Sequence, residues 1–148
     1  PDWVQLSLHD AIERNTQGIQ LINCCSENQT ITVAAGLSVG GKRPLLIMQN
    51  QGLYNCINTL RAVCLDAHIP MVLMVGQFGR EYANLSEDPK HSGRSMVYIM
   101  EPLLDALGIQ HMRLDTASDL PKLEEAYALA EANGNAVVLL VSGPMAWS

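Results

Sequence analysis

Three uninterrupted apolar runs place the tightest limit on how this chain can fold. They cover residues 45–48, 71–76 and 136–141. A strand that is apolar at nearly every position suits a parallel sheet with both faces covered, whereas a half-exposed strand alternates between apolar and polar residues. Helix-like segments separate the runs, which favours right-handed βαβ units. The pattern therefore predicts an α/β fold with a doubly wound, mainly parallel sheet and helices on both faces.

The pattern of apolar and turn-forming residues also predicts the other helices and strands. Further strands are expected at 19–24 and 110–114, and helices at 4–15, from Ser26 to Gly40, from Gly52 to about 67, at 100–107, and from Ser118 or Asp119 to Gly134. Ser26 is the expected N-cap of the second helix, and Gln29 three residues later completes a capping box. With 148 residues the chain has the size of one ordinary domain, so we expect a single domain over 1–148.

Composition excludes several classes of function. The net charge of -6 and the pI near 5.0 give no basic footprint for nucleic acid. No apolar run reaches the roughly 18 residues that a membrane-spanning helix needs. The four cysteines, of which Cys24 and Cys25 are adjacent, form neither a disulfide framework nor a CxxC metal site. We therefore expect reduced thiols packed in the core of a cytoplasmic protein that binds no membrane and holds no metal through its own side chains.

Polar residues end two of the predicted strands. Glu27 follows the strand at 19–24, and Gln49, Asn50, Gln51 and Gly52 follow the strand at 45–48. Open α/β sheets bind ligands at the carboxyl ends of their strands, so these side chains are candidates for a binding site. Structural explanations stand beside this one, because an acid in the first turn of a helix stabilises the helix, and Asn and Gly favour turns.

The segment 77–94 is polar and long for a connection in a compact domain, and such loops are usually functional or disordered. It carries Arg80, Lys90, His91 and Arg94, and His91 is the histidine best placed to contact a substrate.

A near match to the phosphate-binding GxxxxGK[ST] motif occurs at 36–43. It ends a helix instead of opening one and has Arg43 in place of the hydroxyl, so we read its glycines as a helix stop.

These residues together resemble the pyrimidine-binding domain of thiamine-diphosphate-dependent decarboxylases, in particular the group that acts on phosphonopyruvate and sulfopyruvate. The matching residues are Glu27 with Ala35-Gly36, Gly41-Lys42, residues 48–53 (MQNQGL) with Asn55 and Asn58, residues 87–91 (EDPKH), and residues 103–109 (LLDALGI). Pro1 and Asp2 are similar to the end of the family's first active-site loop, which implies a preceding strand outside this sequence. The likeness covers nearly the whole chain.

The resemblance implies a role for each candidate residue. Glu27 would be catalytic, forming a hydrogen bond to N1′ of the aminopyrimidine ring of thiamine diphosphate. The cofactor-binding set would be Glu27, Gln49, Asn50, Gln51 and Gly52. The substrate, a small anionic 2-oxo acid, would meet Asp2, Trp3, Asn55, Arg80, His91 and Arg94. Trp3 stands where phosphonopyruvate decarboxylases typically carry serine, which leaves the substrate open. Glu81, Glu87 and Asp88 could neutralise the loop cations instead.

The family's diphosphate-binding half carries a Gly-Asp-Gly motif that helps to hold Mg²⁺, and no Gly-Asp-Gly occurs in this sequence. The resemblance therefore implies a split enzyme in which a beta subunit holds the metal and the diphosphate. It also implies self-association through the pyrimidine domain, as in an α2β2 assembly, with Glu27 at a subunit interface. Three alternatives remain open: another thiamine-diphosphate lyase or carboligase, a non-catalytic binding or regulatory module of the same fold, and a flavodoxin-like or nucleotide-binding domain.

Overall fold

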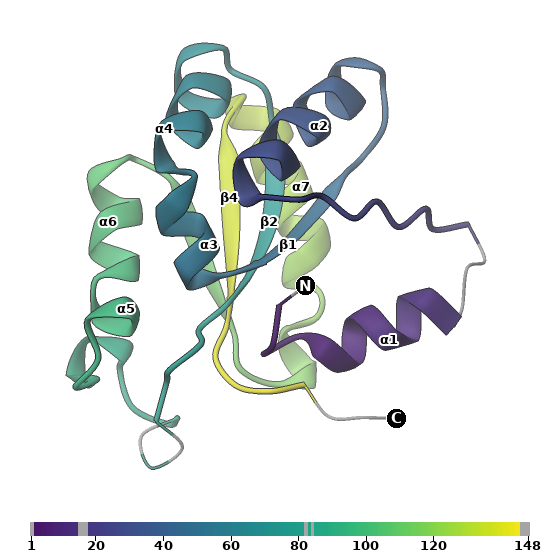
Figure 1. Ribbon diagram of the computed structural model, residues 1–148. Helices are drawn as coiled ribbons and strands as arrows, with labels where there is room; N and C mark the ends of the chain where they lie inside the picture. The colour runs from purple at the N-terminus through teal and green to yellow at the C-terminus, as the bar shows by residue number, and fades with distance from the viewer. Residues whose placement is uncertain (1, 15–17, 82, 84, 146–148) are drawn as a thin grey trace.

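The computed structural model describes residues 2–14, 18–81, 83 and 85–145. Its centre is a four-stranded sheet in the order β1-β2-β4-β3, and every neighbouring pair is parallel. The strands are β1 (Leu45–Gln49), β2 (Met71–Gly76), β3 (Gln110–Leu114) and β4 (Ala136–Val141). The parallel sheet confirms the predicted α/β fold (Figure 1).

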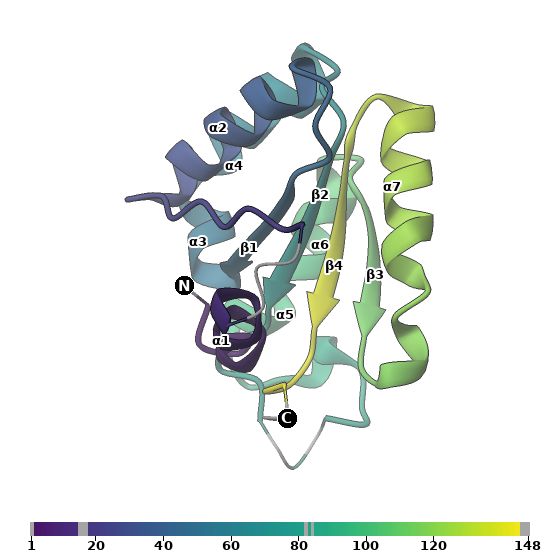
Figure 2. The same ribbon diagram turned by 90° about the vertical axis from the view of Figure 1, so that its right-hand side faces the viewer.

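Helices cover both faces of the sheet (Figure 2). The α-helices are α1 (Leu6–Arg14), α2 (Glu27–Val39), α3 (Asn50–Asn55), α4 (Ile57–Leu60), α5 (Ser95–Tyr98), α6 (Met100–Ala106) and α7 (Lys122–Asn133). Arg61–Asp66 continues α4 as a π-helix, and single 3₁₀ turns form at Pro89–His91 and Ala117–Asp119. Helices α2 to α6 cover one face, whereas α7 packs on the opposite face (Figures 1 and 2).

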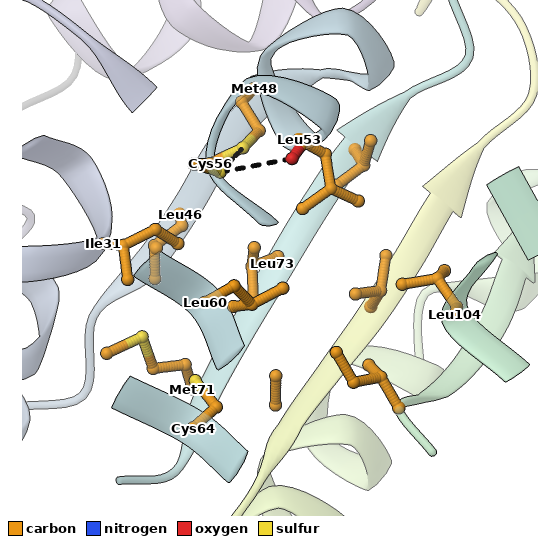
Figure 3. Close-up of a cluster of buried hydrophobic side chains, with 14 of the residues drawn as sticks. Ile31, Leu46, Met48, Leu53, Cys56, Leu60, Cys64, Met71, Leu73 and Leu104 are labelled. Carbon is orange, nitrogen blue, oxygen red and sulfur yellow. Dashed lines mark hydrogen bonds between the residues drawn. The ribbon is translucent and has the colours of Figure 1, made fainter. Parts of the chain in front are cut away.

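The two central strands separate two apolar clusters. β2 and β4 are buried at every position. Leu73 and Val75 face the cluster beneath α2, α4 and α6, whereas Val72 and Met74 face the cluster beneath α7. Figure 3 shows Leu73 surrounded by side chains of the first cluster, including Leu60 of α4. The continuous apolar runs in the sequence are therefore explained by burial on both sides.

The ends of α2 agree with the expected signals. The Ser26 side chain caps the helix by accepting a hydrogen bond from the Gln29 backbone N–H at 3.3 Å. The Gln29 side chain reaches back to the N–H of Cys25 at 2.7 Å, one residue before the cap, so the capping box takes a shifted form. The helix ends at Gly40, and Gly41 adopts a φ of 76°, which confirms a helix stop in place of a phosphate loop.

One expected strand and several expected helix boundaries were wrong. Residues 19–24 form no strand, and Ile19 and Ile22 are exposed. A strand needs a ladder partner, and within the described ranges no segment pairs with them. The first helix begins at Leu6 instead of residue 4, and its expected end at Asn15 lies outside the described residues. The helix expected after Gly52 already begins at Asn50.

Candidate functional site

The carboxyl ends of β1 and β2 collect the side chains that the sequence singled out. The start of α2 brings Glu27 there, the start of α3 follows directly from β1, and the N-terminal segment crosses the same edge (Figure 1). The Trp3 backbone N–H donates a hydrogen bond to the Gln49 side-chain oxygen at 3.0 Å. Three segments that are distant in sequence therefore meet at the edge where open parallel sheets bind ligands.

Glu27 lies directly against the glycine of α3. A Cβ atom built on Gly52 would lie 2.4 Å from Cγ and 2.7 Å from Oε1 of Glu27, so only glycine leaves room for this carboxyl. The Asn55 amide donates to Oε2 of Glu27 at 3.4 Å. The side chain is partly exposed, and it occupies the first turn of α2, where backbone N–H groups provide a positive potential. The carboxyl is thus held in place but remains reachable.

Asn28 fastens the same turn of α2 to the next helices. Its amide nitrogen donates to the Asn55 carbonyl oxygen at 3.4 Å, and its oxygen accepts from the Thr59 hydroxyl at 2.5 Å. Sequence reasoning missed Asn28 and Thr59, because the residues that they bond lie 27 and 31 positions apart in the chain. The one available signal was that Asn28 and Thr59 are polar residues on helix faces that also carry apolar neighbours. These bonds restrict how far Glu27 can move away from α3.

The fully buried thiol of Cys56 is close enough to this carboxyl to feel its charge. Burial raises the pKa of Cys56 to about 12, and the negative charge of Glu27 adds to this effect. A thiol with so high a pKa stays protonated at neutral pH and is a poor nucleophile. Cys56 therefore serves as packing beneath the site, whereas Cys25 is exposed, contrary to the expectation that all four cysteines lie in the core.

The three amides at the end of β1 and the start of α3 have different surroundings. Asn50 is fully buried, and its side-chain nitrogen donates to the carbonyl oxygens of Phe78 at 3.0 Å and Met96 at 2.9 Å. Gln51 is exposed, and its amide nitrogen lies 4.0 Å from the Met96 sulfur. Gln49 is partly exposed. Asn50 thus finds its partners within the chain, the Gln49 oxygen is engaged by the Trp3 N–H, and Gln51 is the exposed amide.

Asp2 anchors the N-terminal segment to the sheet. Its fully buried carboxylate accepts hydrogen bonds from the backbone N–H groups of Gly76 at 2.9 Å and Val4 at 2.8 Å, and from the Gln5 amide at 2.5 Å. Burial raises the pKa of Asp2, and these hydrogen bonds offset part of that rise. Trp3 beside it is 68% exposed. Of this pair, Trp3 is the side chain that an incoming molecule can reach.

The loop cations also divide into two groups. Arg80 donates to the Gln77 side-chain oxygen at 2.9 Å and to the carbonyl oxygens of Leu85 at 3.1 Å and Glu87 at 2.6 Å. These contacts bind the loop together. His91 and Arg94, by contrast, are exposed on the surface, as is Lys90. A substrate contact by Arg80, His91 or Arg94 stays a prediction, and the exposed pair is the more accessible.

The acids of the loop have partners of their own. The Glu81 carboxylate accepts from the Ser92 hydroxyl at 2.8 Å and the Gly93 N–H at 3.0 Å. Asp88 pairs with Arg113 at 3.1 Å, and hydrogen bonding from the Lys90 backbone, together with Arg113, lowers the pKa of Asp88. Arg113 in turn makes two bonds to Glu101, which is buried. The loop is therefore tied to β3 and α6.

Two kinds of feature are absent from the described part of the chain. No group of three or more His, Cys, Asp or Glu side chains is arranged to hold a metal ion there. None of the helices in those ranges is long and apolar enough to cross a membrane.

Comparison with known proteins agrees with the resemblance found in the sequence. The chain is 38% identical over 55 residues to the sulfopyruvate decarboxylase subunit alpha of Methanothermobacter thermautotrophicus, a match covering 37% of this chain and 33% of that protein. It is 26% identical over 126 residues to a sulfopyruvate decarboxylase of Methanosarcina acetivorans, covering 85% of this chain and 31% of that protein. The chain thus spans about a third of the length of each relative. No protein-family model matches it.

The contact between Gly52 and Glu27 can be tested by adding one methyl group. Gly52→Ala should lack the stabilisation of roughly 1 kcal/mol that alanine brings to a helix, because the new Cβ overlaps the Glu27 side chain and forces it to move. Gly36→Ala in α2 is the matched control: a Cβ there meets nothing within 4 Å, and the change should stabilise the helix by up to roughly 1 kcal/mol. Urea denaturation measures both. Equal effects of the two substitutions would contradict the close packing of Glu27 on Gly52.

Proposed function

We propose that this chain is the pyrimidine-binding alpha subunit of a split, thiamine-diphosphate-dependent 2-oxo acid decarboxylase. Its substrate would be sulfopyruvate, phosphonopyruvate or a similar acid, released as an aldehyde and carbon dioxide. The observation that carries the proposal is the carboxyl of Glu27. It lies at the carboxyl edge of a parallel sheet, against a glycine that leaves room for it and beside an amide that orients it. Similarity to two sulfopyruvate decarboxylases supports the same assignment.

The residues of this chain fit the cofactor chemically. Thiamine diphosphate, when bound, supplies the electron sink that allows a 2-oxo acid to lose carbon dioxide. Glu27 would share a proton with N1′ of the pyrimidine ring, and Asn55 would hold the carboxyl in the orientation that this requires. Gln49 and Gln51 have amide groups at the same edge that can bind the ring or the substrate.

The substrate side of the proposal rests on the exposed groups around this edge. His91 and Arg94 carry exposed ring and guanidinium groups, which suit a sulfonate or phosphonate. The Trp3 backbone bonds to Gln49, and the exposed Trp3 ring would limit the size of the substrate. Asp2 and Arg80 would act indirectly, by anchoring the segments that carry Trp3 and the loop cations.

The diphosphate half of the site would come from a second chain. A beta subunit carrying Gly-Asp-Gly would hold Mg²⁺ and the diphosphate, and would cover Glu27 at the interface. Self-association through this domain and an assembly such as α2β2 belong to the same proposal, as does a location in the cytoplasm.

The decisive variant is Glu27→Gln. The chain is co-expressed with a Gly-Asp-Gly-bearing partner, and carbon dioxide release from sulfopyruvate, phosphonopyruvate and simple 2-oxo acids is assayed with thiamine diphosphate and Mg²⁺. We expect turnover to fall about 10²–10⁴-fold, because the amide cannot exchange a proton as the acid does. Glu125→Gln on α7, at the opposite face of the sheet, should leave turnover unchanged.

Three results would oppose the proposal in different ways. Near-normal turnover of the Glu27→Gln enzyme would remove the proposed activator. Activity of this chain without a partner would refute the split site. Cofactor binding without decarboxylation of any 2-oxo acid would favour another lyase or carboligase, or a non-catalytic module.

The proposed domain would also include one more strand, at the outer edge of β1. β1 pairs with β2, and across the described ranges no strand pairs with its other side. The segment 19–24 lies on this side without a ladder (Figures 1 and 2). Asp2 and Trp3 meet the sheet at its carboxyl end, where a parallel strand ahead of Pro1 would deliver the chain. Such a strand would satisfy the outer edge of β1 and cover the exposed isoleucines of 19–24.

Hydrogen–deuterium exchange tests this addition. The 148-residue chain is compared with one extended by the residues that its reading frame encodes ahead of Pro1. We expect amides of residues 19–24 and of the outer edge of β1 to exchange about tenfold more slowly in the extended chain. Amides of β3, at the far edge of the sheet, serve as the internal control. Equal exchange in the two chains would contradict the added strand.

A further inference from the structure

The carboxamide of Asn50 is used completely within the chain. Asn50 is fully buried, and its nitrogen donates to the carbonyl oxygens of Phe78 at 3.0 Å and Met96 at 2.9 Å. Its oxygen accepts from the Gln51 backbone N–H at 2.9 Å. An asparagine side chain has two N–H donors, and both are engaged here. No donor of Asn50 is left for a cofactor or a substrate.

The two carbonyl groups belong to opposite ends of the long loop. Phe78 lies two residues after β2, and Met96 lies in α5, just beyond the loop. The Tyr54 hydroxyl adds a second bond to the Met96 carbonyl at 3.1 Å. A Cβ atom on Gly79 would lie only 2.8 Å from the Met96 sulfur, so the two ends also touch each other. One side chain at the start of α3 therefore joins both ends of the loop to the strand end that carries the amide cluster.

The bonds from Asn50 to the carbonyl oxygens of Phe78 and Met96 form a junction. This junction also locates Arg94 relative to the candidate site. A Cβ atom on Gly79 would lie 3.4 Å from Cδ of Arg94, so the Arg94 side chain lies over the junction. The Met96 sulfur also lies 4.0 Å from the amide nitrogen of Gln51. Gln51 is the residue after Asn50 and precedes the glycine against which Glu27 packs. The junction thus sets the spacing between an exposed guanidinium and the edge that carries Glu27.

We propose that Asn50 is a positioning residue that fixes Arg94 against the candidate cofactor site, so that Arg94 binds the second anionic group of the substrate. The inference rests on the proposed function, because it assigns a substrate class to the same site. It also changes the role expected for Asn50, which acts through the loop and does not contact the cofactor. The remaining amides of the cluster, Gln49 and Gln51, are the ones left to bind a ligand.

Asn50→Asp tests the junction on the isolated chain, without activity. Aspartate has nearly the same shape and still accepts the Gln51 N–H, but its ionised carboxylate faces two carbonyl oxygens with no proton to donate. At pH 8 we expect the hydrogen-exchange protection of residues 77–81 and 92–96 to fall about tenfold or more. Near pH 5 part of the protection should return, because the protonated acid can donate one bond. Asn133→Asp, the same chemical change on α7, should leave the protection of these residues unchanged at both pH values.

The second readout is the kinetics of the complex with its partner. Asn50→Asp should raise KM for a sulfonate- or phosphonate-bearing 2-oxo acid about tenfold and change kcat by less than about threefold, whereas KM for pyruvate should stay constant. A fall in kcat with constant KM would overturn the positioning role, because it would indicate an action at the reacting centre. Unchanged exchange in the loop would overturn the junction itself. If no partner restores decarboxylation, the proposed function fails, and the exchange experiment still decides whether Asn50 holds the loop.

Discussion

Burial of the two central strands on both faces is the constraint on which the rest of this structure depends. β2 and β4 carry apolar residues at every position, and helices cover them on each side. Polar side chains that must remain reachable can then lie only at the ends of the strands. All strands are parallel, so their carboxyl ends share one edge. That edge gathers the first turn of α2, the start of α3, the N-terminal segment and the base of the long loop.

Most of the sheet could be predicted from the sequence, because a strand buried on both faces has an unmistakable apolar run. The cap of α2 could be predicted because its partners lie within three residues. Residues 19–24 show the limit: their apolar pattern suits a strand, but a strand also needs a neighbour, and local pattern carries no information about that. The same limit applies to Asn50, whose carbonyl partners lie 28 and 46 residues away in the chain.

Within the candidate site, the sequence predicted where polar residues gather more readily than what each of them contacts. Glu27 was selected by resemblance, and its packing on Gly52 gives a physical reason why a glycine follows the amide cluster. Asp2 and Arg80 were expected to contact substrate, yet in the structure their polar atoms hold the N-terminal segment and the loop. Asn28 and Thr59 were not selected, although they fasten the turn that carries Glu27. The proposed enzyme therefore depends on a few reachable groups held by many buried ones.

Glu27 is proposed here as the acid of a cofactor site that a second chain completes. The most direct measurement is an experimental structure of this chain co-purified with its diphosphate-binding partner and thiamine diphosphate. We expect a carboxyl oxygen of Glu27 at about 2.6–3.0 Å from N1′ of the aminopyrimidine ring, enclosed by the partner. A structure of that assembly in which Glu27 is open to bulk water, or in which another acid meets the ring, would contradict it.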